Sequence, residues 1–261
     1  MSDIKEILLD DVYAAMWLIY GGWGVGKTYS LGSLPGKTMI ILTEMKNPHR
    51  VLSYAKGKYK IYPLAVVEDG KIRHRTFDEL MAQLNEWLNE AMEGTKPFDN
   101  LCVDSLSELQ SIFGEDIEDD VCQRRAEDGK SVDRILDRFY KPRDAYIPLN
   151  STMKRVTKML QKFTMFGINV ICTAGVADKD EFNQEIKPFF IAKEYPSLLS
   201  GFFDFVGYIF PNKTEAGEVQ YPPNVMFKLS ENPKSKCGDP RIEGVGGLNF
   251  ESIFNKLEEE K

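Results

Sequence analysis

Near its start the chain carries a glycine-rich stretch that fixes both a local fold and a type of ligand. Residues 21–28 read Gly-Gly-Trp-Gly-Val-Gly-Lys-Thr and match the pattern G-x-x-x-x-G-K-[ST] without a gap. A strand-like apolar run at residues 14–20 precedes this stretch, and a segment able to form a helix follows it. Because the glycines let backbone N–H groups turn toward phosphate oxygens, a strand, this loop and a helix in succession are typical of a nucleoside triphosphate site.

The pattern gives the residues of the loop their expected roles. The Lys27 ammonium is predicted to reach the β- and γ-phosphates of ATP and to act in catalysis, and the Thr28 hydroxyl is predicted to bind Mg²⁺. The alternative is a glycine turn that only joins two elements, but a chance match is expected in about 1% of chains of this length. The predicted nucleotide-binding residues are Gly21, Gly22, Trp23, Gly24, Val25, Gly26, Lys27, Thr28 and Tyr29.

A phosphate site of this kind also needs an acidic metal ligand. The apolar run at residues 101–103 ends in Asp104, and a carboxylate at that edge of a parallel sheet would lie beside the loop. We predict that Asp104 binds Mg²⁺ together with Thr28. The alternative role for Asp104 is the N-cap of the helix that follows, a position where Asp is common.

Hydrolysis further requires a group that orients and deprotonates the attacking water. In AAA+ ATPases a glutamate directly after the metal-binding aspartate has this role, but here Ser105 occupies that position. The run at residues 39–43 ends in Glu44, and parallel topology would place this strand tip beside the phosphates. We predict that Glu44 is the catalytic base. An ordinary exposed loop carboxylate is the alternative.

Composition limits the partners and the setting of the chain. Of its 261 residues 43% are hydrophobic and 28% charged, which suits one large α/β domain. The net charge of −7 argues against a broadly basic surface, so any contact with nucleic acid must be local. No apolar run approaches the ~18 residues of a membrane span, and the N-terminus lacks the features of a signal peptide. Four cysteines without a C-x-x-C pair favour a reducing, cytoplasmic setting.

Apolar runs and helical patterns alternate along the chain, which predicts an α/β fold with a mostly parallel sheet flanked by helices. The expected parallel strands are residues 16–20, 39–42, 101–103 and 168–172. Amphipathic helices are expected at residues 77–92 and 151–166, a hairpin at 66–75 and a final helix at 251–257. Antiparallel strands at residues 205–210 and 225–229 are expected to extend the sheet on its C-terminal side. We expect a single domain over residues 1–261, with an N-terminal extension at 1–13 and an acidic tail at 258–261.

Together these segments resemble the RecA-like ATPases, and among them the short, core-only members encoded by bacteriophages. The resemblance rests on residues 19–28, 40–44 and 101–106, on the helix 146–163 with the strand 168–173, and on residues 196–208. It spans most of residues 14–255. It implies a RecA-like P-loop core that hydrolyses Mg²⁺·ATP, binds single-stranded DNA and promotes annealing or strand exchange in the cytoplasm of a bacterial host. It also implies a homo-oligomeric ring or filament and a single-strand DNA-binding protein as a further partner.

The resemblance also makes the long polar segment at residues 176–196 the DNA-binding loop. Within it Lys179, Lys187 and Lys193 are predicted to pair with DNA phosphates, and phenylalanines to stack on bases. The alternative is a solvated surface loop whose aromatic side chains return to the core. One departure concerns the preceding strand, where the family places Gln or His as a sensor of the γ-phosphate. Here Gly175 stands at that position, and Thr173 is the nearest polar candidate.

In RecA-like assemblies the neighbouring subunit supplies a Lys or Arg to the transferring phosphoryl group. Lys236 and Arg241 are the candidates for this trans-acting role. Two other functions stay open. One is an ATP-gated binding module for replication or recombination partners with little turnover, which Gly175 and the acidic balance favour. The other is a small-molecule kinase, which ranks last because no Arg-dense lid stands out beyond residues 124–125.

Overall fold

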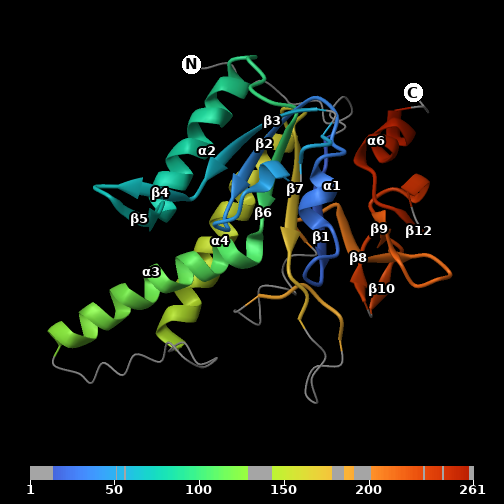
Figure 1. Cartoon of the computed structure of the whole chain (residues 1–261). Helices are drawn as coiled ribbons and strands as arrows, with labels where there is room; N and C mark the ends of the chain where they lie inside the picture. The colour runs from blue at the N-terminus through green and yellow to red at the C-terminus, as the bar shows by residue number, and fades with distance from the viewer. Residues whose placement is uncertain are drawn as a thin grey trace.

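The computed structural model describes residues 14–50, 52–55, 57–128, 143–177, 185–190, 201–231, 233–242 and 244–258. These residues form an eight-stranded sheet flanked by helices, with the strand order β12-β9-β8-β1-β7-β6-β2-β3 (Figure 1). Its strands are β1 (Met16–Gly21), β2 (Lys37–Leu42), β3 (Lys58–Pro63), β6 (Asn100–Asp104), β7 (Asn169–Ala174), β8 (Phe205–Lys213), β9 (Val219–Met226) and β12 (Val245–Gly247). Two small hairpins pair β4 (Ala65–Glu68) with β5 (Lys71–His74) and β10 (Ser230–Glu231) with β11 (Lys234–Ser235). The helices are α1 (Lys27–Leu31), α2 (Phe77–Met92), α3 (Leu106–Glu127), α4 (Arg143–Thr164) and α6 (Phe250–Glu258). The predicted α/β class is confirmed.

The directions of the strands correct one expectation. From β8 to β3 the neighbouring strands are all parallel, and only β9 and β12 add antiparallel pairs. The strand at residues 205–210 was expected to be antiparallel, and this prediction is wrong. It is part of β8, which runs parallel to β1, with Phe205 paired with Trp17. Two parallel strands require a long crossover connection between them, and residues 175–204 separate β7 from β8 in the chain. Of the strand expected at 225–229, only residues 225–226 are in a strand, at the end of β9, which starts earlier, at Val219.

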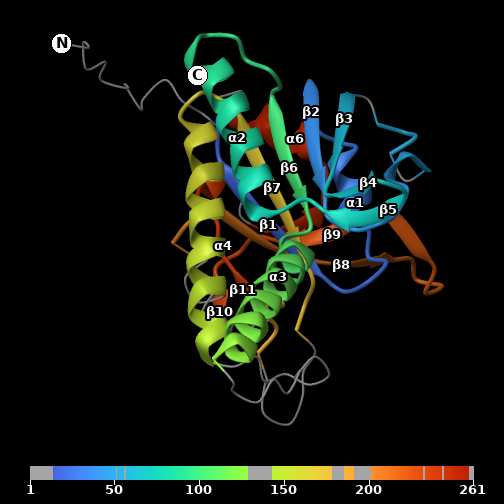
Figure 2. The ribbon, with the colours of Figure 1, turned by 90° about the vertical axis from the view of Figure 1, so that its left-hand side faces the viewer.

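Helices cover both faces of the sheet (Figures 1 and 2). On β1, Met16, Leu18 and Tyr20 join the core cluster under α2, α3 and α4, whereas Trp17 and Ile19 join the cluster under α1 and α6. All residues of β1 are buried for this reason. A strand covered on both sides has no polar face, so its sequence is continuously apolar instead of alternating.

The hairpin of β4 and β5 is tied to the start of α2. The Thr76 hydroxyl accepts a hydrogen bond from the Glu79 N–H (3.3 Å), and the Thr76 N–H donates to the Glu79 carboxylate (2.7 Å). Two nitrogens of Arg73 on β5 donate to the same carboxylate, at 2.8 Å each. These hydrogen bonds lower the pKa of Glu79 to about 2, and those from Arg73 have the largest effect. The capping box and the bounds of the helix at residues 77–92 are confirmed.

Helices α4 and α6 differ from expectation only at their ends, and α6 is one residue longer at each end than predicted. Helix α4 starts at Arg143, earlier than predicted, and contains Pro148 beyond its first turn, where the missing N–H removes one intrahelical hydrogen bond. Gly167 follows α4 with a positive φ of 72°.

In the part of the chain that the structure describes, no helix combines the length and apolarity needed to cross a bilayer. The extension at residues 1–13 and residues 259–261 of the tail lie outside the described residues.

At the end of β1 the sheet leaves no room for a side chain. Gly21 pairs with Ile209 of β8, and a Cβ at Gly21 would lie 2.4 Å from the Ile209 carbonyl oxygen. At the next residue, Gly22, a Cβ would meet its nearest neighbour, Val25 Cγ1, at an ordinary 3.7 Å. The first glycine of the loop therefore serves the close packing of two strands.

We expect Gly21→Ala to lower the free energy of unfolding by about 1–3 kcal/mol, because the added methyl group overpacks against backbone. The matched control Gly22→Ala should change it by less than about 0.5 kcal/mol. Urea unfolding followed by circular dichroism measures both variants. Equal losses in the two would show that the contact between β1 and β8 is not the cause.

Candidate nucleotide-binding site

The glycine-rich loop joins the end of β1 to the start of α1, at the carboxyl edge of the parallel strands (Figure 1). Gly24 and Gly26 have φ of 71° and 102°, a left-handed backbone that favours glycine. Gly26 is the N-cap of α1 and offers no side chain to the N–H groups of the first turn. These N–H groups are then available to an external acceptor such as a phosphate. Trp23, at the tip of the loop, is 89% exposed.

Lys27 points back into the loop. Its ammonium donates to the carbonyl oxygens of Gly21 (2.8 Å) and Gly22 (2.7 Å). Burial lowers the pKa of Lys27, an effect that the nearby Asp104 opposes and Lys46 reinforces. Phosphate oxygens are charged acceptors and form stronger hydrogen bonds with an ammonium than carbonyl oxygens do. A bound triphosphate would therefore replace the two carbonyl oxygens as the hydrogen-bond acceptor of the Lys27 ammonium. The role of Lys27 in nucleotide binding stays a prediction.

Asp104, at the end of β6, is the centre of the site. Its side chain is only 2% exposed. The Thr28 hydroxyl donates to one carboxylate oxygen (2.7 Å) and the Thr173 hydroxyl to the other (2.6 Å). The alternative role as N-cap is not what the structure shows, because Ser105 caps α3 by accepting from the Glu108 N–H.

The pair of Thr28 and Asp104 fits a magnesium ion. Hydroxyl and carboxylate oxygens are the hard ligands that Mg²⁺ prefers, and here the two meet on one side of the loop, 2.7 Å apart. When bound, the ion would neutralise charge on the β- and γ-phosphates. The sequence predicted both residues for this site, and their metal-binding role stays a prediction.

Glu44 follows β2 and lies on the same edge of the sheet. Strands β2 and β6 are neighbours, with Leu42 beside Asp104. The Thr43 hydroxyl donates to the carbonyl oxygen of Asp104 (2.9 Å) and accepts from the Ser105 N–H (2.7 Å), which holds the two strand ends together. The predicted position of Glu44, at the same sheet edge as Asp104, is therefore what the structure has, while its catalytic role stays a prediction.

Lys46 is a residue of the site that the sequence analysis missed. Its ammonium lies 2.8 Å from a Glu44 carboxylate oxygen and 3.6 Å from an Asp104 carboxylate oxygen. Burial alone would lower the pKa of Lys46, but Asp104 and Glu44 outweigh it and hold the pKa above the ordinary value of lysine. The spacing Glu-x-Lys directly after a strand is the only signal in the sequence, and it does not say in which direction the lysine turns.

Three tyrosines cluster beside the loop, and of these the sequence analysis named only Tyr29. The ring of Tyr29 stacks on Tyr54 (3.9 Å between centroids) and lies 4.6 Å from Tyr221 of β9. The Tyr221 hydroxyl contacts the carbonyl oxygen of Gly24 at 3.4 Å. An adjoining cavity of about 160 Å³ is lined by Tyr29, Ser30, Gly32, Ser33, Tyr54, Pro222, Leu248, Asn249 and Glu251. The rings come from three distant parts of the chain, so no local pattern could predict the cluster.

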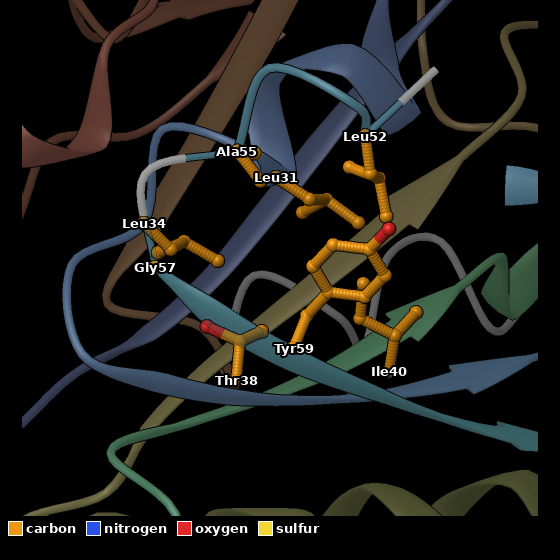
Figure 3. A pocket seen from close by; sticks show the side chains of 9 residues that line it. Leu31, Leu34, Thr38, Ile40, Leu52, Ala55, Gly57 and Tyr59 are labelled. Atoms are coloured by element: carbon orange, nitrogen blue, oxygen red, sulfur yellow. The ribbon is translucent and has the colours of Figure 1, made fainter. Parts of the chain in front are cut away.

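A second hollow, between α1 and the strands β2 and β3, is part of the core. Figure 3 shows the side chains that surround it, among them Leu31, Leu52 and Tyr59. Its volume of about 10 Å³ admits one water molecule at most. It holds no ligand-sized space.

The base of the predicted DNA-binding loop adjoins the site. The Ser107 hydroxyl accepts from the Gly175 N–H (3.0 Å) and donates to the Phe189 carbonyl oxygen (2.8 Å). Lys187 lies 3.7 Å from Glu185 in an ion pair. Phe190 is buried, as the alternative of a loop with returning aromatics expects, whereas Phe189 is exposed. Lys179 and Lys193 lie outside the described residues.

The two trans-acting candidates make contacts within their own subunit. The Lys236 ammonium donates to the Phe203 carbonyl oxygen (2.7 Å). The Arg241 guanidinium binds both carboxylate oxygens of Asp239 and lowers the pKa of that carboxyl. Their role toward a neighbouring subunit stays a prediction.

A parallel α/β sheet with a glycine-rich phosphate loop after β1 and a buried aspartate against the loop threonine defines a P-loop nucleotide-binding domain of the ATPase type. The chain belongs to the AAA domain family, whose sequence profile matches residues 14–239. This match covers every described strand and helix from β1 to β11, and with them the glycine-rich loop, Glu44, Lys46, Asp104 and Thr173. No curated protein matches the chain in sequence.

We expect the Tyr221 ring to contribute to binding of the nucleotide base. Tyr221→Ala should weaken binding of Mg²⁺·ATP about tenfold, since stacking of a base on an aromatic ring is worth about 1–3 kcal/mol. Binding of inorganic triphosphate, which has no base, should change much less, and Tyr221→Phe is the matched control. Calorimetric titration measures both ligands. An equal loss for the two would mean that Tyr221 only supports the loop, through its contact with Gly24.

Proposed function

We propose that this chain is an ATP-hydrolysing recombination protein that binds single-stranded DNA and promotes annealing or strand exchange. The observation that carries the proposal is the place of Glu44. It stands at the tip of β2, beside Asp104, whereas the residue directly after Asp104 is Ser105. This is the arrangement that the resemblance to RecA-like ATPases implies, and the AAA domain match supports the ATPase part of the proposal.

In this proposal the chain's own residues divide the work of hydrolysis. Glu44 orients a water molecule for in-line attack on the γ-phosphorus and accepts its proton. Lys27 leaves the carbonyl oxygens of Gly21 and Gly22 and neutralises the charge that builds on the phosphoryl oxygens. Thr28 and Asp104 hold the metal, and the buried Thr173 hydroxyl fixes the orientation of the Asp104 carboxylate.

The contacts at the end of β7 support a link between this site and DNA. Thr173 donates to Asp104, and two residues further on the Gly175 N–H donates to Ser107, whose hydroxyl also donates to the Phe189 carbonyl oxygen. Short contacts therefore lead from Asp104 to Gly175, where the loop at residues 176–196 begins, and to Phe189 within it. The net charge of −7 confines the DNA contact to such a local element, with Lys187 and the predicted Lys179 and Lys193.

Exposed apolar side chains around the site favour a ring or filament. Trp23 on the loop and Met45, next to Glu44, are both large, apolar and exposed. Single exposed apolar residues are common, but two at the rim of one site suit contact with a second copy. That copy would supply Lys236 or Arg241.

One observation favours the second candidate, an ATP-gated binding module with little turnover. At Gly175, where a polar sensor side chain is expected, the structure has only backbone, and its N–H is already bonded to Ser107. Such a site can change shape on binding ATP without coupling hydrolysis to DNA.

ATP hydrolysis with and without single-stranded DNA separates the two candidates. DNA should raise the rate, Lys27→Ala should abolish nucleotide binding, and Glu44→Gln should lower turnover about 10²–10⁴-fold while ATP still binds. Glu86→Gln, on the exposed face of α2, is the control. Tight ATP binding with negligible turnover whatever DNA is added would favour the gated module and remove the catalytic role of Glu44.

A further inference from the structure

Directly after β2 the chain turns so that Lys46 returns to the strand edge it has just left. Its ammonium contacts Glu44 at 2.8 Å and Asp104 at 3.6 Å. Its side chain is 38% exposed, whereas that of Asp104 is 2% exposed. One lysine therefore reaches from the surface to both carboxylates of the site, one of which is almost fully enclosed.

The oxygen that Lys46 approaches is the one a metal ion would need. Asp104 Oδ1 accepts from Thr173, and Asp104 Oδ2 accepts from Thr28 and faces the Lys46 ammonium. An ion held by the Thr28 hydroxyl and Asp104 would approach this same Oδ2. Two cations within a few ångströms repel strongly where the surroundings are partly buried. Lys46 and the metal therefore exclude each other at Asp104.

From this geometry we infer that Lys46 is a tethered counter-ion that competes with Mg²⁺ for Asp104 and holds the Glu44 carboxylate in position. The inference rests on the proposed metal-binding role of Asp104. When the metal and nucleotide bind, the Lys46 ammonium moves away from Asp104 and remains paired only with Glu44, the nearer of the two carboxylates. Lys46 is a positioning residue in this scheme and touches no reacting atom.

The expected size of the effect follows from the exposure of the lysine. Ion pairs near a protein surface change an equilibrium by about two- to fivefold. A competitor of that strength raises the Mg²⁺ concentration needed for nucleotide binding by the same factor. Its loss should therefore lower the half-saturating Mg²⁺ concentration, an effect opposite in direction to the loss of a ligand.

The test titrates Mg²⁺ into the full-length protein in the presence of a slowly hydrolysed, fluorescently labelled ATP analogue and follows its anisotropy. Lys46→Gln should lower the half-saturating Mg²⁺ concentration about two- to fivefold. Lys46→Arg, which keeps the charge, should stay near the wild-type value, and Lys60→Gln, on the exposed edge of β3, should not change it. An unchanged or increased Mg²⁺ requirement in Lys46→Gln overturns the inference.

Thermal unfolding gives a second readout that does not depend on nucleotide. In a chelator, Lys46→Gln should melt below wild type, because Asp104 and Glu44 lose their shared counter-ion, and added Mg²⁺ should narrow the difference. A difference that Mg²⁺ leaves unchanged also overturns the inference. Both readouts measure binding or stability and not turnover, so the absence of DNA-stimulated hydrolysis would remove the proposed function without deciding the role of Lys46.

Discussion

The buried carboxylate of Asp104 is the interaction on which the rest of the site depends. It receives Thr28 from the start of α1 and Thr173 from β7, and it stands at the end of β6. Polar oxygens in so enclosed a position require hydrogen-bond partners, and each of the two donors comes from a different element. This one side chain therefore fixes the relative positions of the glycine-rich loop, the end of β6 and the strand that leads to the predicted DNA-binding loop.

The sheet explains why residues so distant in sequence meet at Asp104. Parallel strands end at the same edge, so β1, β2, β6 and β7 all deliver their following residues to one place. The order of the strands separates the phosphate loop after β1 from Asp104 by the width of β7, and the side chains of Thr28 and Asp104 bridge that space. Helices on both faces bury these strands and keep the edge rigid.

Local patterns in the sequence predicted the elements whose cause is local. The loop, its flanking strand, the helix at residues 77–92 with its capping box and the strand ending in Asp104 all follow from short runs of residues. The direction of β8 was predicted wrongly because it depends on the path of the long connection before it. The hydrophobic pattern of the strand itself is the same in either direction. The tyrosine cluster and Lys46 were missed for a similar reason: tertiary packing brings the rings together, and a backbone turn decides where the lysine points.

The exposure of Trp23 has a practical consequence. Of the three tryptophans in the chain, Trp17 and Trp87 are buried, so the indole on the phosphate loop is the one in contact with water. Emission from a solvated indole shifts when the ring enters a less polar surrounding, whether a ligand or a second copy covers it. The phosphate loop thus carries an optical label of its own, and its rearrangements can be followed in the unmodified protein.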